Sequence, residues 1–468
     1  MSRELLEIRS WLSKGDRTAL LTPQPRSPRA AEDGAPRPVI EVDPLTEYQS
    51  MDGFGFALTG GSALLIGTMP EPERTRLLKA LFSPEGEGIG ISMLRVSLGA
   101  SDLSEASYSY DDLPPGETDP ELAHFSLKAG DPHVIPLLQA ILAVNPAIRI
   151  IGSPWSPPPW MKTGGSFVGG RLLPECRQIY ARYLVKFVAE MKANGIVIHA
   201  LTPQNEPRNR KNEPSMEMDP GEQAVFIKDH LGPALREAGL EAVELFCWDH
   251  NCDEIGFPLA ILADAEARKY IAGVAWHLYA GEITALSEVH AAYPLMKMYF
   301  TEQWVGSDGN FAGDLRWHFR HVLIGATRNW SRVVLEWNLA SDPLCGPHTE
   351  GGEARCVGAL TIGQGITRNV SYYVIAHAAK FVPPGSQRIG SNCIDSLPNV
   401  AFRTPDGNIV LIVLNDGTDA RAFDIAFAGR RAREVLDAGA AATYVWPAIP
   451  GATVTEPMMA TIPGYWRG

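Results

Sequence analysis

The chain has 468 residues, of which 45% are hydrophobic and 20% are charged, so intrinsic disorder is excluded as a general description because the apolar material suffices for large cores. The 41 lysine and arginine residues stand against 54 aspartate and glutamate residues, and the formal net charge of −13 argues against binding to nucleic-acid backbones or anionic membrane surfaces. The length predicts about three domains, or fewer if one of them is an α/β barrel of about 250 residues or more.

Residues 1–35 are predicted to precede the regular part of the chain, as a short helix over 1–14 followed by an arm rich in proline and arginine. The segment has scattered charges and lacks the apolar core of a secretory signal, and no uninterrupted apolar run of about 18 residues occurs in the chain. We therefore expect no transmembrane helix and a cytoplasmic location, or secretion if the N-terminus has been trimmed.

From residue 53 onward, short apolar runs of β type alternate with longer helical segments, which is typical of βα units around a parallel sheet. Eight such runs predict an α/β fold, a (β/α)8 TIM barrel, over residues 52–382. The runs cover residues 53–59, 92–97, 147–153, 196–203, 242–248, 271–279, 295–302 and 331–337.

After about residue 383 the apolar residues alternate with polar ones at a period of two, and DG turn pairs interrupt them. This pattern predicts antiparallel hairpins. We expect a small antiparallel β-sandwich side domain built from residues 383–468 together with residues 36–51.

Two carboxylates follow predicted strands at their carboxyl ends, where the active sites of TIM barrels lie. Glu206 follows the fourth run in TPQNEP, and Glu302 ends the seventh in FTEQW. Cleavage of a glycosidic bond needs such a pair, because one carboxylic acid protonates the leaving oxygen while the other, ionised, attacks the anomeric carbon or activates water. Pro207 is expected to hold Glu206 in an extended backbone.

Aromatic and polar side chains at other strand ends add to this pattern. Eight of the 11 tryptophans fall in the barrel segment, and tryptophan faces stack on sugar rings while Asp and His bond their hydroxyls. Each residue alone is explained equally well by packing or by a turn, and only their joint occurrence favours a sugar site. The candidates are Asp102, Trp155, Trp160, His277, Tyr279 and Trp337, with Asp249 as a possible positioning residue.

Two rival functions are considered. A metal-dependent barrel hydrolase would need clustered histidine ligands such as HxH after the first strand, which the sequence lacks, so we expect neither a metal nor a cofactor. A non-catalytic carbohydrate-binding barrel would keep the tryptophans but lose one of the two carboxylates. The six cysteines form no CxxC motif and are expected to be reduced, and pairing of Cys345 with Cys356 stays open.

A series of motifs occurs in the order GFGFALT, LRVSLGASDLS, SPWSPPPWMKTGG, TPQNEP, AWHLY, FTEQW, EWNLASDP and HAAKFVPPGSQRIG. With these motifs the chain resembles glycoside hydrolase family 30, the glucosylceramidase-like enzymes, from about residue 53 to residue 388. The resemblance implies a retaining β-glycosidase with Glu206 as acid/base and Glu302 as nucleophile. It also implies that Asn205 bonds the sugar 2-hydroxyl, that Asp102, Trp155, His277, Tyr279 and Trp337 form the wall of the −1 site, and that Trp304 and His348 are further candidates.

Some positions depart from the glucosylceramidase branch of that family. Gly60 replaces an acidic residue, Leu103 an aromatic one, and His348 an asparagine. The SPWSPPPWMKTGG and WDHN segments are closer to a bacterial branch of β-1,6-glucanases and β-glucosidases. We therefore expect a carbohydrate substrate of the β-linked glucoside class, with β-xylosides or β-fucosides as the alternatives. Endo or exo action and the oligomeric state stay open.

Overall fold

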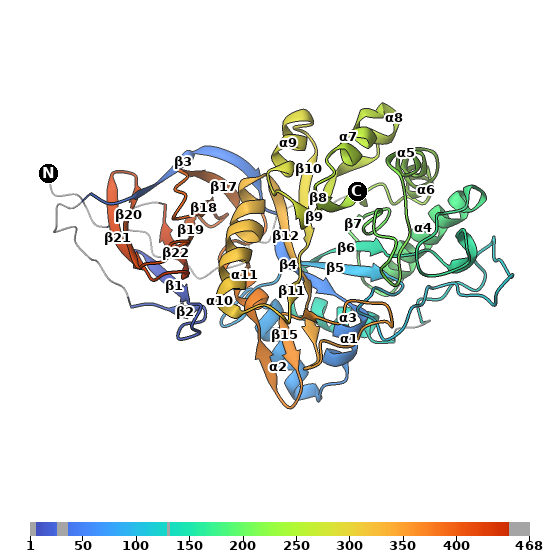
Figure 1. Cartoon of the computed structure of the whole chain (residues 1–468), viewed down its shortest axis with the longest axis horizontal. Coiled ribbons are helices and arrows are strands. Elements are labelled where there is room, and N and C mark those ends of the chain that lie inside the picture. Colours follow the sequence, from blue (N-terminus) through green and yellow to red (C-terminus); the bar gives the residue numbers. More distant parts are fainter. Residues whose placement is uncertain (1–5, 26–35, 129–131, 449–468) are drawn as a thin grey trace.

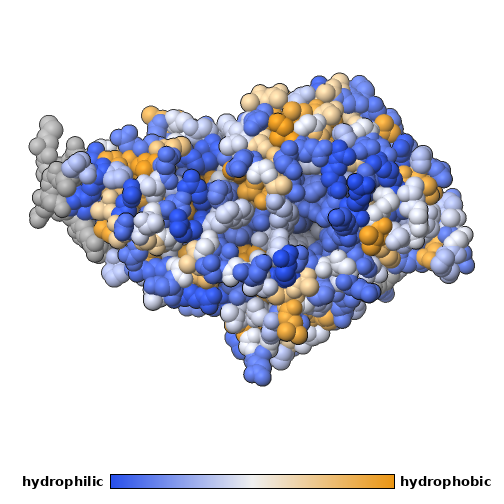
Figure 2. Space-filling model, in the orientation of Figure 1, coloured by the Kyte–Doolittle hydropathy of each residue, from blue (hydrophilic) through white to orange (hydrophobic). Residues whose placement is uncertain are grey.

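The computed structural model describes residues 6–25, 36–128 and 132–448. Figure 1 shows a helix-covered barrel on the right and a β-rich domain on the left, with α10 (Phe311–Trp317) and α11 (Val370–Ala379) between them. Figure 2 shows hydrophilic residues over most of this face, with apolar groups scattered among them. In the described residues, no helix combines the length and the apolar character that a membrane crossing requires.

Eight parallel strands close into a barrel in the order β10-β12-β4-β5-β6-β7-β8-β9, so the predicted (β/α)8 fold is confirmed. Each lies within or overlaps one of the predicted runs, because strands buried on both faces read as continuous apolar segments. They are β4 (Gly53–Leu58), β5 (Met93–Leu98), β6 (Arg149–Pro154), β7 (Ala200–Leu201), β8 (Glu244–Cys252), β9 (Ile271–Gly281), β10 (Lys297–Glu302) and β12 (Ser331–Asn338).

Helices surround the barrel and bury one apolar stripe each, as the 17-residue α4 does with Tyr180, Leu184, Phe187 and Met191 at helical spacing. Besides α10 and α11, the α-helices are α1 (Gly60–Gly67), α2 (Glu71–Phe82), α3 (Val134–Val144), α4 (Arg177–Ala193), α5 (Pro220–Val225), α6 (Gly232–Glu237), α7 (Gly256–Ala263), α8 (Ala265–Arg268) and α9 (Ala285–Ala292). The 3-10 turns are η1 (Pro159–Met161) and η2 (Pro174–Cys176), and the π-helical segments are η3 (Phe226–Leu231) and η4 (His318–Ala326).

The β-rich domain contains a nine-stranded sheet in the order β2-β1-β22-β19-β18-β17-β3-β20-β21. The 12-residue β3 pairs with β17 through residues 42–50 and with β20 through residues 39–41, so it runs along both parts of the β-sandwich. Ile40, Phe423 and Trp446 are among the side chains of its separate core. The strands are β1 (Arg9–Ser13), β2 (Thr22–Pro23), β3 (Val39–Ser50), β17 (Gln387–Ser391), β18 (Asn399–Arg403), β19 (Asn408–Leu414), β20 (Arg421–Phe427), β21 (Arg430–Leu436) and β22 (Ala441–Pro447).

The predicted helix over residues 1–14 is wrong for its described part, because residues 9–13 form strand β1. This strand pairs along its whole length with β22, and Trp11 packs against Phe381 with ring centroids 4.4 Å apart. Pairing with a distant strand and burial of one aromatic ring therefore outweigh the local helical pattern. Residues 26–35 of the predicted arm and residues 449–468 of the predicted side domain lie outside the described residues.

The loops of the barrel contain several short strands, and the loop after β12 also carries two cysteines. Cys345 and Cys356 are both free thiols, which answers the question of their pairing. The short strands are β11 (Val305–Gly306), β13 (Ala340–Ser341), β14 (Cys356–Val357), β15 (Leu360–Ile362) and β16 (Ile366–Arg368).

His377 on α11 joins the barrel to the β-rich domain. Its Nδ1 lies 2.8 Å from the Thr443 hydroxyl on β22, and its Nε2 lies 2.9 Å from the Ser13 hydroxyl on β1. The side chain is fully buried, and burial lowers the pKa of His377 from 6.5 to about 3. The imidazole is therefore neutral in the folded protein at neutral pH.

We predict that His377→Leu lowers the free energy of unfolding by about 1–3 kcal/mol at pH 7, because the buried hydroxyls of Ser13 and Thr443 each lose one of their hydrogen bonds. The free energy of unfolding of the variant should also depend less on pH than that of the wild type. In the wild type the unfolded His377 takes up a proton below pH 6.5 while the folded one does not until about pH 3, so acidification through this window destabilises the fold. Urea unfolding at pH 7 and pH 5 measures both effects. The exposed His124→Asn is the control, and an equal response of the two variants to pH would contradict the prediction.

Candidate active site

Inside the barrel, a layer of polar side chains lies next to an apolar layer, on the side of the carboxyl ends of the strands. The alternation of side chains along each strand produces this arrangement. Met93, Ile151 and Tyr299 belong to the small apolar cluster formed with the other barrel strands. Side chains two positions further along a strand point to the same side. Further toward the carboxyl ends of the strands, the residues that point into the barrel are Arg95, Ser153, Thr202, His277, Thr301 and Trp337. The polar residues among them are fully buried.

Arg95 is the centre of this layer. Its Nη1 donates to Glu302 Oε2 at 2.6 Å, and its Nη2 donates to Asn205 Oδ1 at 2.6 Å and to Asp249 Oδ2 at 2.8 Å. The guanidinium also lies 4.8 Å from the ring centroid of Trp155. A fully buried guanidinium needs such partners, because an unpaired charge in the interior is strongly unfavourable.

Asp249 is the fixed counter-charge to Arg95. Its carboxylate also accepts hydrogen bonds from the hydroxyls of Thr202 and Thr301, both at 2.7 Å, and from Ser153 at 2.8 Å. Burial alone would raise the pKa of Asp249, but Arg95 and the hydrogen-bond donors hold it well below its usual range. Asp249 is therefore an anion beneath the cavity, in contact with Arg95 and His277, and its role as a positioning residue stays a prediction.

His277 links both predicted catalytic carboxylates to Asp249. Its Nε2 lies 3.1 Å from Asp249 Oδ1, and its Nδ1 lies 3.1 Å from Glu206 Oε1 and 3.6 Å from Glu302 Oε1. One nitrogen thus contacts both glutamates, of which Glu206 lies in the loop after β7 and Glu302 is the last residue of β10. The Oε1 atoms of Glu206 and Glu302 therefore lie no further apart than the sum of these two distances, close enough for both carboxyl groups to act on one glycosidic bond.

The two glutamates have different partners. Glu302 accepts from Arg95 and, at 2.9 Å, from the Tyr279 hydroxyl, whereas Glu206 accepts from Asn209 Nδ2 at 2.9 Å and faces His250. Burial raises the pKa of Glu302, and the charges of His277 and Arg95 oppose this rise so that the anion remains accessible.

The proton of this cluster lies between Glu206 and His277. Burial would raise the pKa of Glu206, but His250 and His277 lower it to about 2. Burial would lower the pKa of His277, but Glu302, Asp249 and Glu206 raise it to about 9. In the free protein the shared proton therefore resides on the imidazole, one hydrogen bond away from Glu206.

The backbone at Glu206 differs from the extended conformation expected before Pro207. Its φ is +44°, in the left-handed region, and Asp249 has a φ of +62°. The Asn205 N–H donates to Pro154 at 2.8 Å and the Glu206 N–H donates to the Asp249 carbonyl at 3.0 Å. These bonds to neighbouring strands hold the strained conformation, which is a common property of functional residues.

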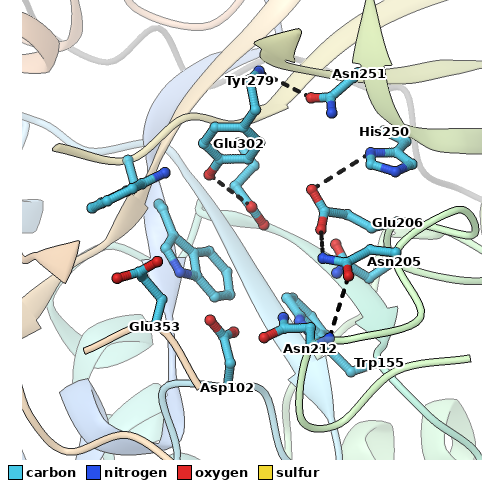
Figure 3. Close-up of a pocket in the computed structure, with 13 residues that line it drawn as sticks. Asp102, Trp155, Asn205, Glu206, Asn212, His250, Asn251, Tyr279, Glu302 and Glu353 are labelled. Atoms are coloured by element: carbon cyan, nitrogen blue, oxygen red, sulfur yellow. Dashed lines mark hydrogen bonds and ion pairs between the residues drawn. The ribbon is translucent and has the colours of Figure 1, made fainter. Parts of the chain in front are cut away.

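A cavity of about 430 Å³ opens above the two glutamates (Figure 3). Trp155 and Trp337 form one wall and stack on each other with centroids 5.2 Å apart, and Leu103 packs behind them. Most predicted site residues meet here. The lining consists of Asp102, Trp155, Asn205, Glu206, Asn209, Asn212, His250, Asn251, Tyr279, Glu302, Trp304, Trp337 and Glu353.

Four predicted residues lie elsewhere. His277 and Asp249 are buried beneath the lining and act through the glutamates. Trp160 donates its indole N–H to the Asp111 carbonyl at 3.0 Å, and His348 Nδ1 lies 2.7 Å from the Thr349 carbonyl, so both support loops and do not line the cavity. Their prediction as substrate contacts is not supported by this geometry.

The sequence interpretation missed several site residues. Arg95 could have been found, because a lone arginine in the apolar run MLRVSL marks a buried charge. His250 and Asn251 directly follow Asp249 in the segment WDHN, and their place at the end of the fifth predicted strand could have indicated that they belong to the site. The loop residues Asn209, Asn212 and Glu353 carry no comparable signal, because only the folded loops bring them to the cavity.

Asp102 faces the cavity, and among the described residues no lysine, arginine or histidine forms an ion pair with it. Burial raises the pKa of Asp102 to about 7, and the negative charges of Glu302 and Glu206 add to the rise. Near neutral pH the carboxyl group is therefore protonated in part of the molecules and can both donate and accept hydrogen bonds.

Glu213 joins three loops that surround the cavity. Its carboxylate accepts from the Ser107 hydroxyl at 3.0 Å and from the Gly351 N–H at 3.1 Å, and its carbonyl accepts from the Thr349 hydroxyl at 2.6 Å. The partners lie in the loops after β5 and β12, and Glu213 itself lies in the loop after β7. The walls of the cavity are thus tied to one another away from the barrel itself.

Known proteins match both domains. The family models for the glycosyl hydrolase family 30 TIM-barrel domain and β-sandwich domain match residues 51–382 and 385–444. The endo-1,6-β-D-glucanase of Aspergillus fumigatus is 33% identical over 395 residues, 78% of each chain. The lysosomal acid glucosylceramidase of Mus musculus is 29% identical over 435 residues, covering 87% of this chain and 83% of its own. A solved endo-β1,6-glucanase superposes with a TM-score of 0.85 at 33% identity, covering 94% of this chain and 99% of that chain.

We predict that Asp249→Asn lowers the free energy of unfolding by about 3–5 kcal/mol, because it leaves the buried Arg95 with one counter-charge fewer. Urea unfolding measures the change. Asp264→Asn is the matched control: Asp264 caps α8 and pairs with Lys228 at 2.7 Å, and asparagine keeps the cap while removing only this partly exposed ion pair. Equal decreases in the free energy of unfolding in the two variants would mean that the buried Arg95–Asp249 pair contributes no more to stability than a partly exposed ion pair.

Proposed function

The chain belongs to glycoside hydrolase family 30 and is a β-glycosidase, and we propose that it cleaves β-linked glucosides with retention of configuration, using Glu302 as nucleophile and Glu206 as acid/base. The observation that carries this assignment is the position of His277 Nδ1, 3.1 Å from Glu206 and 3.6 Å from Glu302. A nitrogen in contact with both carboxyl groups holds them close to one another, and a separation of about 5–5.5 Å is the geometry in which one carboxylate attacks the sugar directly.

In the first step Glu302 attacks the anomeric carbon while Glu206 gives its proton to the leaving oxygen, so a glycosyl-enzyme ester forms as the glycosidic bond breaks. In the second step Glu206 takes a proton from water, the water oxygen attacks the same carbon, and the ester bond to Glu302 breaks. Arg95 and Tyr279 suit Glu302 to the role of nucleophile, because both donate to its anionic form.

Because the pKa of Glu206 is lowered to about 2 in the free protein, its proposed acid role requires a proton from His277, and the hydrogen bond between them supplies the path. A proton on His277 Nδ1 needs to move along a single hydrogen bond to make Glu206 the acid. Asp249 keeps the other nitrogen of the ring occupied, so the imidazole retains its orientation in both protonation states. When the glycosyl ester forms, the charge on Glu302 disappears and Glu206 can work as the base.

The charges around the cavity support a neutral sugar. Asp102, Glu206, Glu302 and Glu353 line it, and the lining residues in the described part of the chain include no lysine or arginine. A uronic acid would meet repulsion from these carboxylates. Glucose, xylose and fucose units all satisfy this constraint.

The relatives favour glucose and a β-1,6 linkage. The fungal relative at 33% identity and the solved structure with a TM-score of 0.85 are both named endo-1,6-β-glucanases. We propose β-1,6-linked gluco-oligosaccharides or glucan as the substrate class. β-Xylosides and β-fucosides are the alternatives within the same mechanism.

We predict that Glu302→Gln abolishes turnover, while Glu206→Ala loses activity selectively. Glu206→Ala should lose about 100-fold to 10,000-fold on a β-1,6-linked glucose disaccharide, because its leaving alcohol needs protonation. The loss on dinitrophenyl β-glucoside should be far smaller, because dinitrophenolate leaves without a proton. Initial rates on both substrates measure the difference.

The matched control is Glu282→Gln, an exposed glutamate in the loop after β9, which should leave both rates unchanged. Full turnover by a folded Glu302→Gln protein would overturn the nucleophile assignment. Equal losses of Glu206→Ala on the two substrates would overturn the acid assignment.

A substrate panel tests the sugar and the linkage. We expect β-1,6-glucan and nitrophenyl β-glucoside to be hydrolysed with kcat/KM at least about 10-fold above nitrophenyl β-xyloside and β-fucoside, because the missing or altered C6 group forfeits contacts of about 1–3 kcal/mol. Product analysis on β-1,6-glucan distinguishes oligosaccharides from glucose alone. A preference for the xyloside or the fucoside would replace the proposed substrate.

A further inference from the structure

Three side chains from three barrel strands or their loops converge on one point beside the cavity. Glu206 follows β7, His250 lies on β8 and His277 lies on β9. One carboxylate oxygen and one ring nitrogen from each histidine all lie within 4.8 Å of one another, and all three residues are buried. Two imidazoles and one carboxylate are a ligand set that Zn²⁺ uses in proteins, with a fourth position left for water.

His277 is oriented as a metal-binding histidine is. Its Nε2 contacts the Asp249 carboxylate at 3.1 Å, and this leaves the Nδ1 lone pair pointing toward Glu206 once the proton there is lost. A carboxylate behind the ligating ring fixes the tautomer and raises the basicity of the ligand nitrogen.

His250 provides the independent observation. The residue is 8% exposed, and its Nδ1 is buried without a hydrogen-bond partner. That nitrogen faces Glu206 Oε1 at 3.5 Å (Figure 3). A buried ring nitrogen without a partner is unfavourable, and a metal ion between it and Glu206 would satisfy it.

The negative charge of the cavity and its opening to solvent both favour the entry of a divalent cation. Four of its lining residues are carboxylates, and Glu206 and His250 both face the open volume of about 430 Å³. An ion can therefore enter from solvent, and a water molecule in the cavity can complete a tetrahedral shell.

We propose that Glu206, His250 and His277 form a site for a divalent transition-metal ion of the Zn²⁺ class, and that occupation of this site inhibits the enzyme reversibly. Binding itself does not depend on the proposed mechanism. The inhibition rests on it, because a Glu206 carboxylate bound to metal can neither give nor take the proton of the reaction. The ion is thus an inhibitor of this site and takes no part in catalysis.

Calorimetric titration of the full chain with zinc chloride at pH 7 tests the site without reference to activity. We expect one site in the wild type, at least about 10-fold weaker binding in His250→Gln, and unchanged binding in the exposed His124→Gln control. Magnesium chloride should give no binding, because Mg²⁺ prefers oxygen ligands. Glu206→Gln is the second variant should His250→Gln not fold, and it should weaken binding likewise. Unchanged zinc affinity in the folded variants overturns the proposal.

Two further measurements separate this proposal from the proposed function. Glu302→Gln should keep one zinc site although it is inactive, because all three ligand residues remain, and turnover by that variant would refute the mechanism while leaving the metal site standing. Zinc should inhibit the wild type, and a chelator should restore the rate. Zinc inhibition that persists undiminished in His250→Gln would indicate a thiol or another target, and would overturn the proposal.

Discussion

The structure of the site depends on one buried charge. Arg95 lies inside the barrel with no exposure to solvent, and such a charge is tolerated only when anions and acceptors surround it. Asp249 and Glu302 supply the anions, and Asp249 is held in turn by hydroxyls from β6, β10 and the turn after β7. Glu302, the proposed nucleophile, is therefore part of the ion network at the carboxyl end of the barrel, and this network fixes its orientation without any substrate.

Much of this arrangement could be predicted from the sequence, because periodicity and strand ends are local properties. Eight buried strands read as apolar runs, and the carboxylates Glu206 and Glu302 stand at their ends. Other features depend on distant partners. Residues 9–13 become a strand because β22 offers a free edge, and Glu206 takes a left-handed backbone because neighbouring strands hold its loop. The positions of Asn209 and Glu353 depend on how long loops close, which no local pattern encodes.

The two histidines of the site differ in one respect that matters for its chemistry. His277 has both ring nitrogens engaged, with Asp249 on one side and Glu206 on the other, so its protonation responds to the charges of the carboxylates. His250 has an unsatisfied buried nitrogen beside the same glutamate. Glu206, the proposed acid/base, thus has one neighbour that can exchange a proton with it and another whose free nitrogen could bind the proposed metal ion.

Glu213 has a consequence for how this site can change over evolutionary time. Because its carboxylate and carbonyl hold Ser107, Thr349 and Gly351 at once, the three loops around the cavity form a single mechanical unit. A lengthened or shortened loop would pull on the other two, so mutations in them should be epistatic and not independent. New substrate ranges would then arise through concerted replacement of several loops, or only after Glu213 itself has been lost, while the barrel beneath stays the same.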